Sequence, residues 1–221
     1  MLTINGRYVE ISQLDTEIYG LKFKPQFVGM YNNDADEESF TTRRGIDEVT
    51  QRNFDLMKEV SAKYMTHGVI EIGVSRNGDG SFTKAILDNK PDTIPYLGID
   101  IEDKRYLNSD YKKIYTITEN SLNQQAVRNY AKEIGMDKIS LLFIDGWHSL
   151  NTVINDWMYA DMLSDDAVVM FHDTNNHPGP TAFLPAIDET KFRVEKFFEN
   201  ENDYGMSIAY KLNQIEERIE C

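Results

Sequence analysis

The sequence predicts an α/β protein with one seven-stranded, mostly parallel sheet, helices on both faces and an N-terminal cap. Apolar runs of five or six residues alternate with segments of helical periodicity, which is typical of a buried parallel sheet. A glycine-rich turn follows the first run and leads into a helix. Near the C-terminal end, two strand-like segments are joined by a short polar turn, which predicts an antiparallel pair.

Composition limits the classes of function. The 221 residues suit one well-cored domain, and the net charge of −14 disfavours binding to nucleic acid or to an anionic membrane. The only cysteine is Cys221, so a disulfide framework or cysteine zinc cluster within one chain is excluded. Neither a signal peptide nor an apolar run of about 20 residues is visible, so we expect a cytoplasmic protein. A homo-oligomer is compatible with this composition.

Residues 1–45 are predicted to form the cap over the site, and residues 46–221 the main domain. Within the cap, residues 8–11 have the pattern of a short strand, and residues 32–39 form an acidic, polar loop. Apolar residues then recur at helical spacing over residues 47–64, which predicts the helix that leads into the first buried strand.

The glycine-rich turn follows a predicted strand at residues 69–72. Gly73, Ser75 and Gly78 nearly match the G-x-G-x-x-G spacing, with serine in the middle place, before a helix that begins at Phe82. Such a turn lets the backbone and the helix amides approach a ligand closely. A carboxylate at Glu71 would repel a pyrophosphate and favours a cationic amino-acid ligand.

The rest of the chain completes the sheet. We expect strands at 96–101, 113–117, 139–144 and 167–171, helices at 82–87, 124–134 and 150–163, and a C-terminal hairpin of strands 192–197 and 205–211. Four strands end in polar residues. These are Glu71, Asp100, Asp145, and His172 with Asp173. Because ligands of open α/β sheets bind at the carboxyl ends of the strands, these side chains are predicted to converge on one crevice.

In this order, the segments 71–75, 98–100, 143–148 and 171–174 resemble motifs of the class I S-adenosylmethionine-dependent methyltransferases. Within them the chain is most similar to the branch with macrocin O-methyltransferase-like and cephalosporin-hydroxylase-like proteins (methyltransferase domain 24 type). The resemblance covers about residues 50–211. It implies a Rossmann-like fold, and the C-terminal hairpin agrees with it.

The resemblance also implies roles for individual residues. The methionine part of S-adenosylmethionine would be held by Glu71 and the glycine loop with Gly73, Ser75 and Gly78. Asp100 would bind the ribose hydroxyls, Asn120 and Ser121 would lie near adenine, and Asp145 near the sulfonium. Related sugar O-methyltransferases bind magnesium through carboxylates at the positions of Asp145, His172 and Asp173. Here His172 replaces one of those carboxylates.

Several of these residues have a second interpretation. Asp100, about 22 positions beyond Gly78, fits a ribose-binding acid or a turn cap. The group Asp145, His172 and Asp173 fits a divalent-cation site or a purely organic site; the carboxylates suit magnesium, and the imidazole suits manganese, iron or zinc. His148 is the candidate general base, or else a histidine that caps the following helix.

Other residues have weaker assignments. Trp147 could stack on adenine, line the acceptor pocket or simply pack, while His67 and His177 lie in predicted loops and receive no role.

The leading hypothesis is a methyltransferase that acts on a hydroxyl of a small molecule or sugar, with His148 and Asp145 as catalytic residues. The alternatives are an NAD-dependent oxidoreductase on a Rossmann fold and a non-catalytic binding domain. A non-haem iron oxygenase with His148, His172 and an aspartate as ligands is a further reading, although such enzymes usually have an all-β barrel.

Overall fold

The computed structural model describes residues 2–4, 7–9, 18–21, 50–75, 81–175, 177–199 and 203–212. Its main sheet has seven strands in the order β5-β4-β3-β6-β7-β9-β8. All run parallel except β9, which is antiparallel to both of its neighbours. The strands are β3 (Gly68–Ile72), β4 (Tyr96–Asp100), β5 (Ile114–Thr118), β6 (Ile139–Ile144), β7 (Leu163–His172), β8 (Phe192–Phe197) and β9 (Met206–Lys211). The predicted sheet and its C-terminal hairpin are therefore confirmed.

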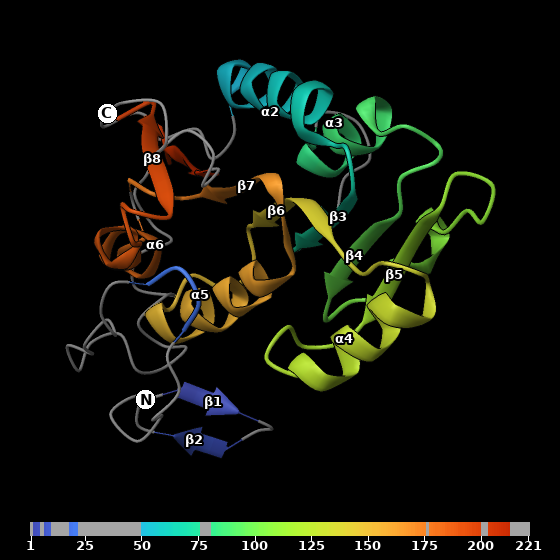
Figure 1. Ribbon diagram of the computed structural model, residues 1–221, viewed down its shortest axis with the longest axis horizontal. Coiled ribbons are helices and arrows are strands. Elements are labelled where there is room, and N and C mark those ends of the chain that lie inside the picture. Colours follow the sequence, from blue (N-terminus) through green and yellow to red (C-terminus); the bar gives the residue numbers. More distant parts are fainter. Residues whose placement is uncertain are drawn as a thin grey trace, which may run out of the picture.

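Helices cover both faces of this sheet (Figure 1). One face carries α2 (Gln51–Tyr64) and α3 (Phe82–Asn89), and the other carries α4 (Gln124–Glu133) and α5 (Leu150–Trp157). Because side chains alternate along each strand, the core is divided into two clusters, one on each face of the sheet. In β3, Val69 belongs to the cluster under α2 and α3, and Ile70 belongs to the cluster under α4 and α5. From β3 the chain proceeds to β4 and β5 on one side and later to β6 and β7 on the other. The boundary between β3 and β6 is thus the topological switch point, the position at which open α/β sheets bind ligands.

Several elements differ from the prediction, and the fifth strand, expected at 167–171, already begins at Leu163. The helix expected at 150–163 ends at Trp157 and continues as a 3₁₀ segment, Met158–Met162, because Leu163 already pairs with β6 as the start of β7. The second strand ends at Asp100, so the residue after it, Ile101, is 74% exposed rather than part of the buried strand. The third strand begins and ends one residue later than expected.

The N-terminal segment is described only in part. Strands β1 (Leu2–Ile4) and β2 (Arg7–Val9) form a separate antiparallel pair next to α5, as Figure 1 shows. Residues 18–21 pack on the main domain, where the indole nitrogen of Trp157 donates a hydrogen bond of 2.7 Å to the carbonyl of Tyr19. The predicted acidic loop and most of the predicted cap lie outside the described residues. The division at residue 45 therefore stays a prediction.

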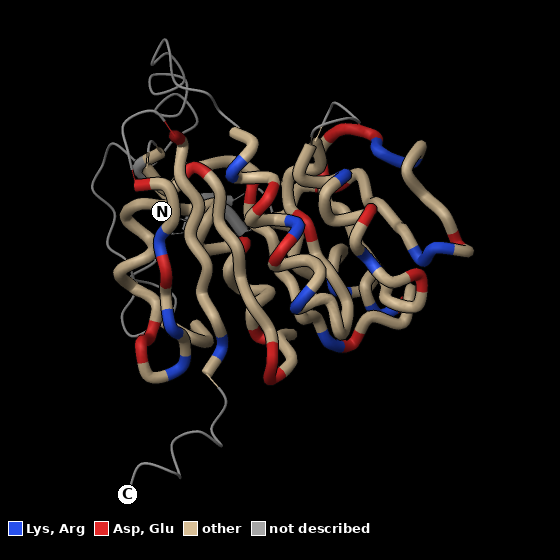
Figure 2. The backbone as a smooth tube through the Cα atoms, turned by 90° about the horizontal axis from the view of Figure 1, so that it is seen from above, with Lys and Arg blue, Asp and Glu red and all other residues tan. Residues whose placement is uncertain are grey.

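The remaining elements connect the sheet. Short 3₁₀ segments lie at Arg105–Leu107 and Leu184–Ala186, and α6 (Pro178–Phe183) follows β7. Lys and Arg residues are interspersed with Asp and Glu along the described chain (Figure 2). Within the described ranges, no helix has both the length and the apolar character of a membrane span.

Candidate active site

The ends of β3 and β6 meet at Gly73. This residue has φ +86°, and a Cβ atom here would overlap the carbonyl oxygen of Asp145. The backbone N–H of Asp145 donates to the carbonyl of Ile72 at 2.9 Å, and that of Gly73 donates to Ile99 at 3.0 Å. Glycine is therefore required at position 73 for the contact between the ends of β3 and β6. The sequence predicted a different reason, the close approach of the backbone to a ligand.

The side chain of Glu71 contacts protein groups rather than solvent, and its predicted contact with a cationic ligand stays a prediction. Strand alternation turns its side chain onto the face covered by α3, where it is fully buried. The hydroxyl of Thr83 donates to its Oε1 at 2.6 Å, and that of Tyr96 to its Oε2 at 2.5 Å. Burial raises the pKa of Glu71 to about 8, although these two hydrogen bonds oppose the shift.

Glu71 is nevertheless connected to the glycine loop. The hydroxyl of Thr83 also accepts a hydrogen bond of 2.9 Å from the backbone N–H of Ser75. The described part of the loop is thus attached to the buried carboxyl through one threonine. Gly78 lies outside the described residues.

Asp100 ends β4 beside this loop. Its Oδ2 accepts a hydrogen bond of 2.9 Å from the N–H of Val74, and its Oδ1 one of 2.7 Å from the N–H of Glu102. The ammonium of Lys104, whose side chain is 4% exposed, lies 3.8 Å from Oδ2. Because each carboxylate oxygen can accept two hydrogen bonds, capping by Asp100 leaves acceptor capacity for ribose hydroxyls.

Asn120 and Ser121 have different surroundings. The side chain of Asn120 is exposed and accepts a hydrogen bond of 2.9 Å from the N–H of Leu122. The carbonyl of Ser121 accepts hydrogen bonds from Asn155 and from the hydroxyl of Tyr159, at 3.0 and 2.8 Å. Ser121 is therefore fixed to α5, whereas Asn120 remains at the surface.

A buried acid on α5 was not foreseen. Asp156 is fully buried, and burial raises its pKa to about 7 against the opposing effect of Ser121 and Asn155. Nothing in the pattern of α5 distinguishes Asp156 from a solvent-facing aspartate.

The predicted metal group converges at the ends of β6 and β7. The Nδ1 of His172 lies 3.1 Å from Oδ1 of Asp145 and 3.2 Å from Oδ2 of Asp173. One ligand atom from each of the three residues lies within 4.8 Å of the other two. Burial lowers the pKa of His172, but the two carboxylates outweigh it and hold this pKa well above its usual range. Burial likewise raises the pKa of Asp173, and the facing His172 and His148 outweigh that effect and lower it.

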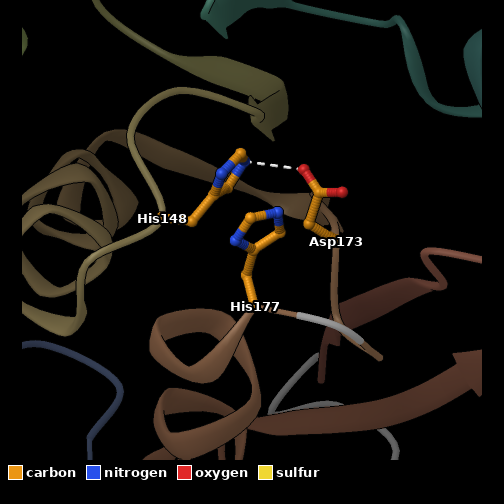
Figure 3. Close-up of side chains that lie close together, drawn as sticks. All are labelled: His148, Asp173 and His177. Carbon is orange, nitrogen blue, oxygen red and sulfur yellow. Dashed lines mark ion pairs between the residues drawn. The ribbon is translucent and has the colours of Figure 1, made fainter. Parts of the chain in front are cut away.

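His148 joins the same group from the β6–α5 loop. Its Nε2 lies next to Asp173 (Figure 3), 2.6 Å from the Oδ2 of that residue, and it lies 3.8 Å from Oδ1 of Asp145. The N-cap of α5 is Ser149, whose hydroxyl accepts the N–H of Thr152 at 3.3 Å. The helix therefore has a side-chain cap other than His148, which weakens the capping interpretation of this histidine. The neighbouring Trp147 is 42% exposed.

His177 is the site residue that the sequence interpretation missed. It is buried, and its ring stacks on that of His148 with centroids 4.2 Å apart and an interplanar angle of 29°. Its N–H donates to the carbonyl of Asp173 at 3.1 Å, so one turn of chain brings it back to the group. The spacing of four residues from Asp173 was the available signal. His67 lies elsewhere, with a 51% exposed side chain near Asp166.

The residues at the ends of β6 and β7 fit a divalent cation. Asp173 has φ +60°, a strained conformation for a residue other than glycine, which is common at functional sites. Its Oδ1 and the Nε2 of His172 are buried and have no hydrogen-bond partner within the described part of the chain. Two carboxylates and an imidazole that face one another at these distances form a donor set for a cation.

No protein-family model and no curated protein sequence matches this chain. Solved structures of O-methyltransferases do. An O-methyltransferase from Bacillus cereus, in complex with SAH, has a TM-score of 0.54 at 10% identity over 79% of this chain and 87% of that one. TomG from Streptomyces achromogenes, involved in tomaymycin synthesis and solved with SAM, has a TM-score of 0.53 at 10% identity over 85% and 92%. MycE from the mycinamycin biosynthetic pathway, solved with Mg, SAH and mycinamycin VI, has a TM-score of 0.53 at 12% identity over 79% and 53%.

These identities show the fold alone. The chain has the Rossmann-like α/β fold of these O-methyltransferases, and an all-β barrel is excluded for the described residues.

Proposed function

We propose that this protein is an S-adenosylmethionine-dependent methyltransferase that acts on a hydroxyl of a small molecule or sugar. One observation carries the proposal. At the switch point of a methyltransferase-type sheet, Asp145, His148, His172 and Asp173 form one group next to the glycine loop. A donor site and a proton-accepting site thus adjoin at the edge where such sheets bind ligands.

The donor would occupy the half formed by β3 and β4. Gly73 and Ser75 would hold its methionine part with backbone groups, together with Gly78, and Asp100 would bind the ribose. Glu71 would act indirectly, because Thr83 connects it to the N–H of Ser75. Asn120 and Ser121 would lie on the adenine side.

The acceptor would lie in front of β6 and β7. Methyl transfer from a sulfonium is an in-line displacement, so the protein mainly aligns the acceptor oxygen, and alignment can contribute ~7–11 kcal/mol. His148 would remove the hydroxyl proton at Nδ1, while its Nε2, 2.6 Å from Oδ2 of Asp173, would donate to that carboxylate, which orients the ring and stabilises its charged form. Asp145, His172 and Asp173 would hold Mg²⁺ or another divalent cation, which lowers the pKa of a bound hydroxyl.

The loop after β7 would form the acceptor side of the crevice. Its Asn175 donates from Nδ2 to the carbonyls of Phe198 and Asp203, at 2.7 and 3.0 Å. These two hydrogen bonds attach the loop to the β8–β9 hairpin. The loop that would contact the acceptor is therefore held in place.

Calorimetry with S-adenosylmethionine and its demethylated product tests the proposal. We expect binding of both compounds, lost or reduced at least about tenfold in Asp100→Ala, because a partly buried carboxylate that hydrogen-bonds a ligand contributes about 1.4 kcal/mol or more. Asp103→Ala is the matched control, since Asp103 lies in the same loop and pairs with the exposed Arg105.

The NAD-dependent alternative has its own outcome. Tight binding of NAD, with no heat from either sulfonium-derived compound, would overturn the methyltransferase proposal. The carboxyl groups near the loop already disfavour a pyrophosphate.

A further inference from the structure

We propose that His148, Asp173 and His177 form a second divalent-metal site, which takes a transition metal and shares Asp173 with the site of Asp145 and His172. One ligand atom from each of the three residues lies within 4.8 Å of the other two. The second site is inferred from these donor atoms and does not require methyl transfer. Only its relation to the first metal site rests on the proposed function.

The three side chains have the arrangement that a shared ion needs. Both imidazole rings lie next to the Asp173 carboxylate, one from the loop before α5 and one from the turn before α6 (Figure 3). Ligand atoms of a metal lie about 2.0–2.2 Å from it and so about 3–4 Å from one another. The distance of 2.6 Å from His148 Nε2 to Asp173 Oδ2 shows that the first pair needs only to open slightly around an ion.

The backbone fixes this arrangement. A Cβ atom on Gly179 would overlap the carbonyl oxygen of His148, so the start of α6 is pressed against the β6–α5 loop. His177 immediately precedes α6, and its N–H is bound to the carbonyl of Asp173. The stacking of the two histidines therefore follows from main-chain contacts, and the donor set is preorganised rather than assembled by long, mobile side chains.

The donor types select the ion. Two imidazole nitrogens and one carboxylate suit zinc, cobalt, manganese or iron, whereas magnesium prefers oxygen ligands. The neighbouring site has the opposite balance, with two carboxylates and one imidazole. The two sites are therefore expected to differ in preference.

Asp173 has the capacity to serve both ions. Its Oδ2 lies close to His148 and to His172, while its Oδ1 has no hydrogen-bond partner among the described residues. A carboxylate has two oxygens and can bridge two ions about 3.5–4 Å apart. An ion in the second site would occupy the Nε2 of His148 and replace its hydrogen bond to Asp173, so metal binding there would oppose proton removal by His148.

Metal titration of the full chain tests this proposal. Protein stripped of metal by chelation is titrated with Co²⁺ by calorimetry and visible absorption, in a Cys221→Ser background that removes the only thiol. We expect two equivalents of Co²⁺ in this background, one in His177→Ala, one in Asp145→Asn and none in Asp173→Asn. Mg²⁺ should fill only the site that Asp145→Asn removes.

His67→Ala is the matched control, because His67 is the one histidine of the four outside the group and its side chain is half exposed. His177→Gln, which fills the same space without a suitable nitrogen, repeats the test if His177→Ala unfolds. An unchanged stoichiometry and affinity in both His177 variants would overturn the proposal. So would a single equivalent that weakens in both Asp145→Asn and the His177 variants, since that result means one mixed site. Binding of the demethylated cofactor, measured in the same samples, reports on the proposed function separately.

Discussion

At the ends of β3 and β4, the carboxyl groups of Glu71 and Asp100 are bound by hydroxyl and backbone N–H groups of the protein. At the ends of β6 and β7, the ionisable side chains face one another instead, and two of their buried atoms, Oδ1 of Asp173 and Nε2 of His172, have no hydrogen-bond partner in the described chain. Both pairs of strands belong to one parallel sheet and end at one edge. The same fold thus carries two kinds of site.

The two halves differ in how they stabilise their buried carboxyl groups. A buried carboxyl is costly unless it is paired or protonated. Glu71 meets this requirement because two hydroxyl groups donate to its carboxyl group and its pKa is raised. The buried carboxyl group in the half formed by β3 and β4 is thus satisfied by the protein, and it holds the glycine loop in place. The group around Asp173 meets this requirement only with neighbouring imidazoles. In the proposed function the half formed by β6 and β7 holds a cation and the acceptor, so substitutions should affect the two halves separately.

The largest effect is expected from Asp173→Asn. It removes the orienting partner of His148 and a ligand of the proposed metal site of Asp145 and His172, so kcat should fall by at least about 10⁴-fold. Affinity for the cofactor product should change by less than about threefold, because Asp173 lies in the other half. Steady-state kinetics and calorimetry measure both. A similar loss of cofactor affinity would break the distinction between the halves.

His148→Ala should have the next largest effect. We expect kcat to fall by ~10²–10⁴ with cofactor affinity nearly intact, the usual scale for a positioned base. His148→Gln separates a base from a packing residue, since glutamine keeps a hydrogen bond to Asp173 but cannot take a proton. Recovery of kcat in the glutamine variant would contradict the base role.

The contrast also explains what could be predicted. The mostly parallel sheet and the meeting of Asp145, His172 and Asp173 follow from apolar runs that end in polar residues, and the C-terminal hairpin follows from two strand-like segments joined by a short turn. These are properties of chain direction in a parallel sheet, and sequence carries them well.

Side-chain direction was harder to predict. Glu71 is one residue from the end of β3, and alternation decides whether such a residue faces the crevice or a helix. His177 belongs to the site because Gly179 permits α6 to contact the backbone of His148, a tertiary contact with no local signature. The described part of the glycine loop omits Gly78, so its predicted role is untested.

The buried carboxyl of Glu71 should give the folded protein a distinct pH dependence. Its folded pKa of about 8 exceeds the ordinary 4.5, so its contribution to stability is fully present below the unfolded pKa. That contribution decreases as pH rises toward the folded pKa, by about 2–4 kcal/mol between about pH 5 and about pH 8. Urea unfolding of Glu71→Gln should lack this decrease. An equal slope in both proteins would show that Glu71 is ionised in the fold.

The smallest effect is expected from Thr83→Val, which is the most specific test of the half formed by β3 and β4. The hydroxyl of Thr83 donates to Glu71 and accepts from the N–H of Ser75, so Thr83→Val removes both hydrogen bonds while it keeps the shape of the side chain. Each such bond is worth about 0.5–1.5 kcal/mol, and the loop should lose part of its preorganisation. We expect calorimetry to show a ~5–10-fold weaker affinity for the cofactor product, with kcat at saturating cofactor unchanged. Thr83→Ser is the matched control, because serine retains the hydroxyl and should restore most of the affinity. If valine and serine variants bind equally well, the loop is held by other contacts and Glu71 has no part in the donor site. If instead kcat falls in the valine variant, the two halves are coupled through the short contact between Gly73 and Asp145.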